Sequence, residues 1–359
     1  MRFSILGVCL AMASTSGTAA ASTTMQEKLD EGVPALLAKH HVASVSIARI
    51  DDGKQSFAAA YGEQKPGTPA TIRTLYNVAS LTKPISAEVM LRLAAQGRLS
   101  LDEPMAPVWT DPDIATDARR DRLTPRLALS HQTGFANWRR ETDGVLKFVR
   151  EPGTQFGYSG EGYEYVAHFA QKKVGGDFEA LAQKLVFDPA GMYDSAYTRR
   201  PWFDGRIAIP VGKDGKNLEP SIGEHFLASD LLYTTPSDYA RFVIGLMNDE
   251  GETPAIASER AKVQVSRKSE MCPPEKSAHC PQEVGMGLGW EVFRFKDDRY
   301  LMHTGRDDGV FTLVFFSPQR RSGTVIFTSS DNGASVVLPI LELIGQEREY
   351  VDFLRDLAG

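Results

Sequence analysis

Hydrophobic residues recur at helical spacing near the start of the chain and then alternate with polar residues. The apolar positions of residues 24–40 lie on one side of a 3.6-residue repeat, and they are Leu29, Val33, Leu36 and Leu37. Residues 42–50 alternate in the manner of a strand, and Asp52-Gly53 is typical of a tight turn. The pattern therefore predicts a helix, a strand, a turn and a second strand over residues 55–61.

The middle of the chain is dominated by helical spacing. A helix is predicted after Ser80, with apolar positions at Ile85, Val89, Leu91 and Leu93. Pro84 fits its first turn and Gly97 its end. Two more helices are predicted, one at residues 163–174 and one after the capping signal of residues 235–238, whereas residues 101–122 read as loop with short helices.

Strand-like segments return near the C-terminus, at residues 290–295, 310–316 and 323–328, and a final helix ends the chain. Strands at both ends with helices between them favour an α/β (α+β) architecture. We expect one sheet built from both chain ends, flanked by helices, with an inserted and mainly helical lobe.

Composition excludes several classes of function. The 359 residues suffice for a large core, and 24% charged with 42% hydrophobic residues is typical of a globular protein. A net charge of −6 without a basic run predicts no nucleic-acid partner. No histidine and carboxylate grouping has the spacing of a metal site, so we expect neither a metal nor an organic cofactor.

The N-terminus has the features of an export signal. Met1-Arg2 is positive, residues 5–12 are apolar, and small residues end at Ala21. Residues 1–21 are therefore predicted to be a signal peptide on a periplasmic or secreted protein. This apolar segment is too short to span a membrane, and no later segment is apolar enough.

Two cysteines remain beyond that signal, Cys272 and Cys280, in a short and proline-rich loop. In an exported protein this spacing predicts a disulfide. The alternative is a metal site that includes His279, although the spacing fits no common zinc pattern.

Ser80 and Lys83 form the one Ser-x-x-Lys tetrad in the chain. On a helix, residues three apart share a face, which brings an ammonium beside the hydroxyl. A nearby cation favours the alkoxide that a serine nucleophile needs. The alternative is that Ser80 only caps a helix and Lys83 is solvated.

Further segments follow in a recognisable order. They are LSHQTGF at 129–135, PGTQFGYSGEGY at 152–163, FDPAGM at 187–192, GLGW at 287–290 and HTG at 303–305. Together with the tetrad, this order resembles the serine β-lactamase and penicillin-binding family. The nearest branch comprises class C β-lactamases, D-alanyl-D-alanine carboxypeptidases and family VIII carboxylesterases.

The resemblance implies one catalytic domain over residues 22–359. Its sheet lobe would take in about residues 22–75 and 260–359, and its helical lobe about residues 80–255.

The resemblance also implies roles for individual residues. Tyr158 would move the proton, helped by Lys83 and His303 as candidate cations. The backbone N–H groups of Ser80 and Arg306 would form the oxyanion hole. Thr304 would bind a substrate carboxylate, and Gly305 would let the strand approach the substrate closely.

One position departs from the family pattern. The family has Tyr-x-Asn, whose asparagine contacts the lysine and the substrate amide, but here the motif is Tyr158-Ser159-Gly160. Glu161 is a candidate substitute that would pair with Lys83; otherwise it is a surface acid. Trp138 is a candidate wall for an apolar acyl pocket, or a packed loop aromatic.

The histidines give little support to a serine–histidine–acid triad. The chain has no Gly-x-Ser-x-Gly segment, so an α/β-hydrolase is disfavoured. His131 is expected to be structural. Glu164 and His168, four residues apart, are expected to form a solvated pair.

These features predict an exported serine hydrolase that works through an acyl intermediate on Ser80. The expected substrates are esters, D-amino-acid peptides or β-lactams, either small molecules or derived from peptidoglycan. The alternative is a penicillin-recognising protein with little or no turnover, because Gly160 weakens the site.

Overall fold

The computed structural model describes residues 23–274 and 278–358. The predicted signal peptide, residues 1–21, lies outside the described residues. Within them, no helix is both long and apolar enough to cross a membrane.

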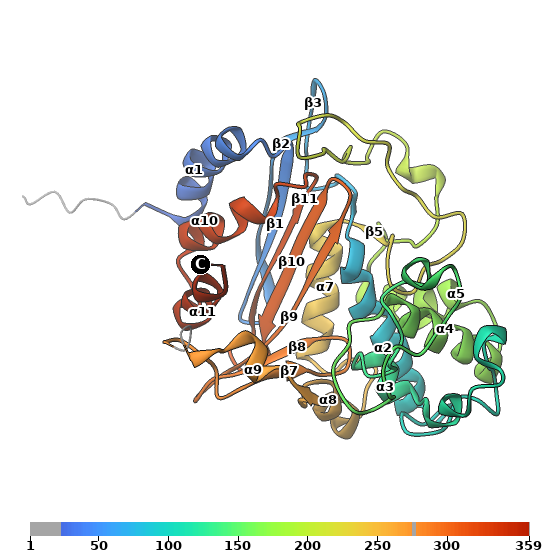
Figure 1. The fold of residues 1–359 in the computed structure, drawn as a ribbon. Coiled ribbons are helices and arrows are strands. Elements are labelled where there is room, and N and C mark those ends of the chain that lie inside the picture. The colour runs from blue at the N-terminus through green and yellow to red at the C-terminus, as the bar shows by residue number, and fades with distance from the viewer. Residues whose placement is uncertain (1–22, 275–277, 359) are drawn as a thin grey trace, which may run out of the picture.

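A nine-stranded antiparallel sheet forms the centre of the described chain, in the order β3-β2-β1-β11-β10-β9-β8-β7-β6 (Figure 1). The strands are β1 Ser44–Asp51, β2 Lys54–Lys65, β3 Thr68–Pro69, β6 Val265–Ser266, β7 Glu283–Met286, β8 Glu291–Arg294, β9 Arg299–Asp307, β10 Val310–Ser317 and β11 Ser322–Thr328. Strand β1 pairs with β11, so that Ile47 lies opposite Ile326. The predicted sheet built from both chain ends is confirmed.

Three helices from the two chain ends cover one face of this sheet (Figure 1). They are α1 Met25–His40, α10 Ala334–Ile344 and α11 Arg348–Ala358. Thr24 and Glu27 form a capping box at the start of α1. The C-terminal segment is two helices where one was predicted, because Gly345 adopts a left-handed φ of +71° and ends α10.

The opposite face carries the central helices. They are α2 Thr82–Ala95, α3 Pro125–Leu129, α4 Gly160–Val174, α5 Phe178–Ala182, α6 Asp188–Ala190, α7 Pro236–Met247 and α8 Pro254–Arg260, with a π-helical turn at Gln183–Phe187. A small ladder joins β4 Tyr76–Asn77 to β5 Tyr233–Thr234. Residues 101–122 contain only short 3₁₀ turns, as predicted. Helix α2 is buried along almost its whole length, which explains its apolar composition.

The hydropathy pattern missed strand β9. Its polar residues His303, Thr304 and Arg306 interrupt the alternation, yet His303 and Gly305 are buried. A 3₁₀ turn at Ala79–Leu81 packs on this strand. The strand is therefore buried by a tertiary contact, which the local hydropathy pattern does not reveal. The excursion of residues 260–282, which precedes β7, contains β6 and the short helix α9, Lys268–Met271.

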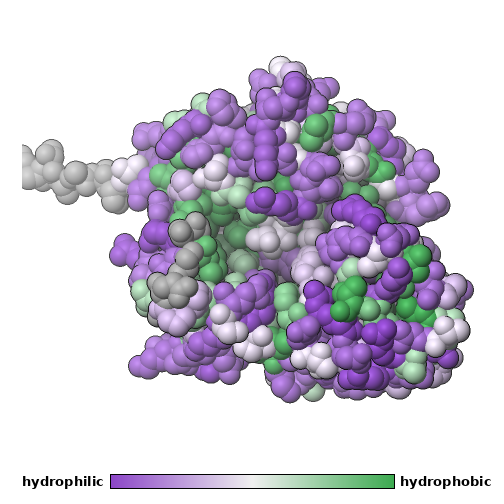
Figure 2. Space-filling model, viewed as in Figure 1, coloured by the Kyte–Doolittle hydropathy of each residue, from purple (hydrophilic) through white to green (hydrophobic). Residues whose placement is uncertain are grey.

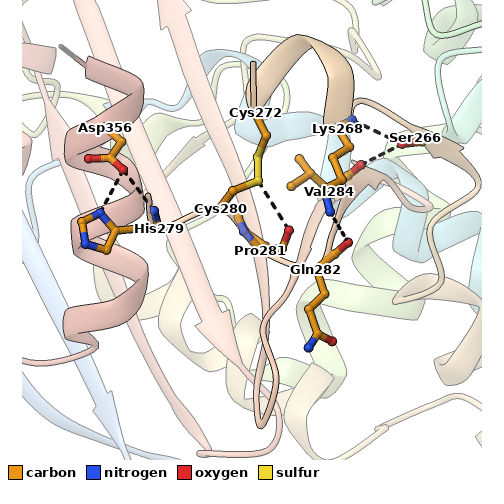
Figure 3. Close-up of a disulfide and its surroundings, with 9 residues drawn as sticks. All are labelled: Ser266, Lys268, Cys272, His279, Cys280, Pro281, Gln282, Val284 and Asp356. Atoms are coloured by element: carbon orange, nitrogen blue, oxygen red, sulfur yellow. Dashed lines mark hydrogen bonds and ion pairs between the residues drawn. A yellow bond between two sulfur atoms is a disulfide. The ribbon is translucent and has the colours of Figure 1, made fainter. Parts of the chain in front are cut away.

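Within this excursion, Cys272 and Cys280 form a disulfide with Cα atoms 5.9 Å apart (Figure 3). His279 does not join the cysteines as a ligand. Its Nδ1 lies 2.9 Å from the Asp356 carboxylate on α11. The loop is thereby tied to the C-terminal helix.

The face of the molecule drawn in Figure 2 is mostly hydrophilic. Figure 2 shows polar residues over most of one face, with apolar residues gathered in patches over the sheet and the helical lobe. This distribution fits a chain whose apolar residues are largely used in its core.

Candidate active site

Ser80 lies on a turn with a constrained backbone. Ala79, the preceding residue, has a φ of +48°, a conformation that costs energy for a residue with a Cβ. Asn77 holds this turn: its Oδ1 accepts the Ala79 N–H at 2.8 Å, and its Nδ2 donates to Asp307 at 3.1 Å. The surroundings therefore impose the position of the Ser80 side chain.

Lys83 is fully buried on the first turn of α2. Its Nζ donates to Ser80 Oγ at 2.9 Å and to the carbonyl oxygen of Ser229 at 2.8 Å. The alternative of a solvated lysine is therefore wrong. A buried ammonium on a serine oxygen is suited to stabilising an alkoxide.

Tyr158 lies beside the same ammonium, with Lys83 Nζ 4.9 Å from its ring centroid. The ring stacks on His131 at a centroid distance of 4.2 Å. His131 Nδ1 accepts the Ser159 N–H at 3.0 Å, so its proton is on Nε2. Burial lowers the pKa of His131 well below its usual value, and the ring is neutral. His131, expected to be only structural, thus holds Tyr158 in place.

Strand β9 forms the opposite side of the site. A Cβ on Gly305 would come within 2.2 Å of the Val78 carbonyl oxygen, so the absence of a side chain allows β9 to lie against the Ser80 turn. Burial, and then the charge of Lys83, lower the pKa of His303 to about 3. His303 is therefore neutral at physiological pH. The expectation that it helps Lys83 as a second cation is wrong.

These residues border one cavity of about 580 Å³. It is lined by Ser80, Lys83, Asn137, Trp138, Arg140, Tyr158, Ser221, Leu227, Asp230, Leu231, Met286, Glu291, His303, Thr304, Arg306 and Asp307. Side chains from both chain halves thus meet around Ser80. Among the described residues, no group of three or more histidine, cysteine or acidic side chains is placed to hold a metal ion.

Glu161 does not take the place of the missing asparagine. Its carboxylate accepts from Arg139, with Oε2 2.8 Å from Nη2 and Oε1 3.0 Å from the backbone N–H. The predicted pairing with Lys83 is therefore wrong: Arg139 provides a closer cation. The space next to Gly160 is occupied by Trp138, since a Cβ at Gly160 would lie 2.9 Å from the indole ring.

A family model described as Beta-lactamase matches residues 29–345 of this chain. The chain belongs to the Beta-lactamase family. This family of serine hydrolases includes β-lactamases and penicillin-binding enzymes, as the order of motifs indicated.

Individual relatives are distant. The D-alanyl-D-alanine-carboxypeptidase/endopeptidase AmpH of Escherichia coli is 23% identical over 305 residues, which is 77% of each chain. A penicillin-binding protein homologue from Pyrococcus abyssi has a TM-score of 0.72 at 19% identity, over 88% of this chain and 77% of its own. The D-alanine carboxypeptidase AmpC from Burkholderia cenocepacia has a TM-score of 0.71 at 19% identity, over 89% and 98%. The structural similarities establish the fold.

A further residue near the site was misjudged from the sequence. Glu164, expected in a solvated pair with His168, accepts from the N–H groups of Ala228 at 3.1 Å and Ser229 at 3.0 Å. It also accepts from the Ser229 hydroxyl at 2.5 Å. Glu164 thereby holds the segment whose carbonyl oxygen binds Lys83. Sequence spacing contains no signal for this contact, because the partners are more than sixty residues apart.

Replacing Glu164 by alanine is expected to lower kcat/KM by about 10- to 100-fold, because loss of these bonds lets the Ser229 carbonyl, and with it Lys83, move. Glu164→Gln keeps one acceptor oxygen and should lose less. The measurement is the pH profile of ester hydrolysis, which a change around Lys83 should shift. Lys172→Ala, an exposed change on the same helix, is the control. An unchanged rate and profile in Glu164→Ala would contradict this role.

Asp230 adds a half-buried carboxyl to the cavity. Burial raises the pKa of Asp230 from 3.8 to about 6, although Lys83 opposes this shift. Between these two values the folded protein keeps a proton that the unfolded chain has lost. The free energy of unfolding therefore falls as the pH rises through this interval.

Asp230→Asn should accordingly be more stable than the parent at about pH 7.5, by up to about 3 kcal/mol, and equally stable at about pH 3.5. Urea unfolding at the two pH values measures the difference. A variant that gains no stability at the higher pH would show that the Asp230 carboxylate is not destabilising.

Proposed function

We propose that this protein is an exported serine hydrolase that cleaves small carboxylic esters through an acyl intermediate on Ser80. The observation that carries the proposal is the 2.9 Å contact between Lys83 Nζ and Ser80 Oγ, in a cavity that Tyr158 also borders. Nucleophile, cation and proton carrier are the groups that acyl transfer requires.

In the proposed reaction these groups act in turn. Ser80 Oγ attacks the ester carbonyl carbon, and its proton passes to Tyr158, which acts as the phenolate and becomes the phenol. The N–H groups of Ser80 and Arg306 bind the oxygen of the tetrahedral intermediate. The bond to the alcohol then breaks, and Tyr158 returns the proton to the departing oxygen. Water attacks the acyl carbon by the same route, which releases the acid and restores Ser80.

Two features of the cavity favour esters over β-lactams and D-amino-acid peptides. Gly160 provides no side-chain amide for a substrate amide, and the indole of Trp138 fills that space. His303 is neutral and gives no fixed charge to a substrate carboxylate.

We expect kcat/KM for a short-chain aryl ester to exceed that for a chromogenic cephalosporin by at least about tenfold, because an ester needs neither of the missing contacts. Both substrates are measured on the same sample. Faster turnover of the cephalosporin would refute the ester assignment and leave the acyl-Ser80 mechanism in place. Stoichiometric acylation without turnover would instead support the binding-protein alternative.

Conversion toward β-lactams needs more than two substitutions. His303→Lys adds a fixed cation and Gly160→Asn adds the missing amide, but an asparagine Cβ would collide with Trp138. Trp138→Ala must accompany them. The relatives named as carboxypeptidases keep a D-amino-acid peptide as the second candidate substrate.

Export is supported by the leader-like residues 1–21 and by the disulfide. The mass of the mature protein tests it, since removal of the leader leaves Ser22 as the first residue.

A further inference from the structure

A second cavity, of about 390 Å³, lies next to the catalytic one and shares two lining residues with it. Trp109, Tyr165, His168 and Phe226 are among the residues that line it. Trp138 and Leu227 border both cavities, so they form the wall between the two. This wall stands in the place where the family asparagine would be.

The indole of Trp138 is held on both sides. Gly160 lies against the ring, closer than any side chain would allow. On another side the guanidinium of Arg140 lies 5.5 Å from the ring centroid. The neighbouring Asn137 is bonded to the start of α4, where its Oδ1 accepts the Gly160 N–H at 2.8 Å. Trp138 is therefore a fixed partition and not a mobile surface residue.

The second cavity suits an apolar group. Trp109 packs on Tyr165 at a centroid distance of 4.6 Å and on His168 at 5.1 Å. Two of its carboxylates, Asp111 and Glu161, are neutralised by Arg139 at 3.2 Å and 2.8 Å. The remaining carboxyl, that of Glu164, accepts hydrogen bonds from the N–H groups of Ala228 and Ser229. An alkyl chain or aromatic ring would meet aromatic walls there, with no unpaired charge from these three groups.

We propose that Trp138 and Leu227 limit the acyl group of the substrate to a short chain. The second cavity is the space that a longer acyl chain would enter if the wall were removed. This inference rests on the proposed function, because it concerns the acyl group carried by Ser80. We place the acyl group of the substrate, and not the alcohol, next to Trp138. Trp138 occupies the position of the family asparagine, and that asparagine would contact the amide of a substrate's acyl group.

The test uses p-nitrophenyl acetate, butyrate, octanoate and dodecanoate with the parent and with Trp138→Ala. The parent should prefer acetate and butyrate. In Trp138→Ala the ratio of kcat/KM for octanoate to that for acetate should rise at least tenfold, since each methylene that gains an apolar site is worth about fourfold. Leu227→Ala opens the wall from its other side and should shift the ratio in the same direction.

Trp202→Ala is the matched control, because Trp202 packs against Phe203 and borders neither cavity. Its ratio should equal that of the parent. If Trp138→Ala does not fold, as judged by thermal melting, Leu227→Ala decides the question alone.

An unchanged ratio in the folded wall variants would overturn the inference. So would a shift seen with octyl esters of acetic acid but not with octanoyl esters, because the wall would then limit the alcohol. In both cases the parent still hydrolyses short esters. If the proposed function itself were wrong, the result would be different, because the parent would then hydrolyse no ester.

Discussion

Ser80→Ala is expected to remove ester hydrolysis, with kcat lower on the order of 10⁵- to 10⁶-fold. The alanine leaves Lys83 and Tyr158 in place but removes the oxygen that attacks the carbonyl. Because Ser80 Oγ accepts one bond from Lys83 and lies at the cavity surface, the fold should lose little stability. Initial rates with an aryl ester, measured beside thermal melting, test both statements.

Ser56→Ala is a matched control, since Ser56 is exposed on β2 and borders no part of the catalytic cavity. It should hydrolyse esters at the parent rate. Retention of more than a small fraction of activity in folded Ser80→Ala would show that another group attacks the substrate.

Lys83→Ala is expected to lower kcat/KM by about 10³- to 10⁴-fold. The ammonium is the charged group that touches Ser80 Oγ, and it also lies over the Tyr158 ring. His303 cannot replace it, since burial keeps that ring neutral. Lys83→Arg should be almost as impaired, because a planar guanidinium cannot reproduce the contacts with Ser80 and the Ser229 carbonyl.

A measurement of unfolding distinguishes a catalytic effect of Lys83→Ala from misfolding. Lys83 is a fully buried cation, and burying a charge carries a large desolvation cost. Lys83→Ala should therefore unfold at a denaturant concentration no lower than the parent, with Lys54→Ala on the surface as control. Loss of both activity and stability would make Lys83 a structural residue instead.

Several helices and the strands β1, β2, β8, β10 and β11 could be predicted because their signals are local. The Thr24 capping box and the alternation along β1 depend on neighbouring residues only. Strand β9 could not be found in this way. Its burial depends on the Ser80 turn, more than two hundred residues away, which packs where Gly305 leaves room.

In the site, too, local contacts could be predicted and long-range contacts could not. The tetrad predicts the contact of Lys83 with Ser80, because one helical turn links them. The partner of Glu161 was mispredicted, since Arg139 comes from a different loop. Glu164 was overlooked as a support of Lys83, because its contacts exist only in three dimensions. His131 was expected to be structural, but its stacking on Tyr158 could not be predicted. The importance of Gly160 could be inferred from sequence, but not that Trp138 fills its place.

The most direct test of the central claim is the site of covalent labelling. The purified protein is incubated with a fluorophosphonate, digested, and its peptides are mapped by mass spectrometry, in parallel with Ser80→Ala. We predict one adduct per chain, on Ser80, and none in the variant. An adduct on another residue of the parent, or labelling that persists in Ser80→Ala, would contradict the acyl-Ser80 mechanism.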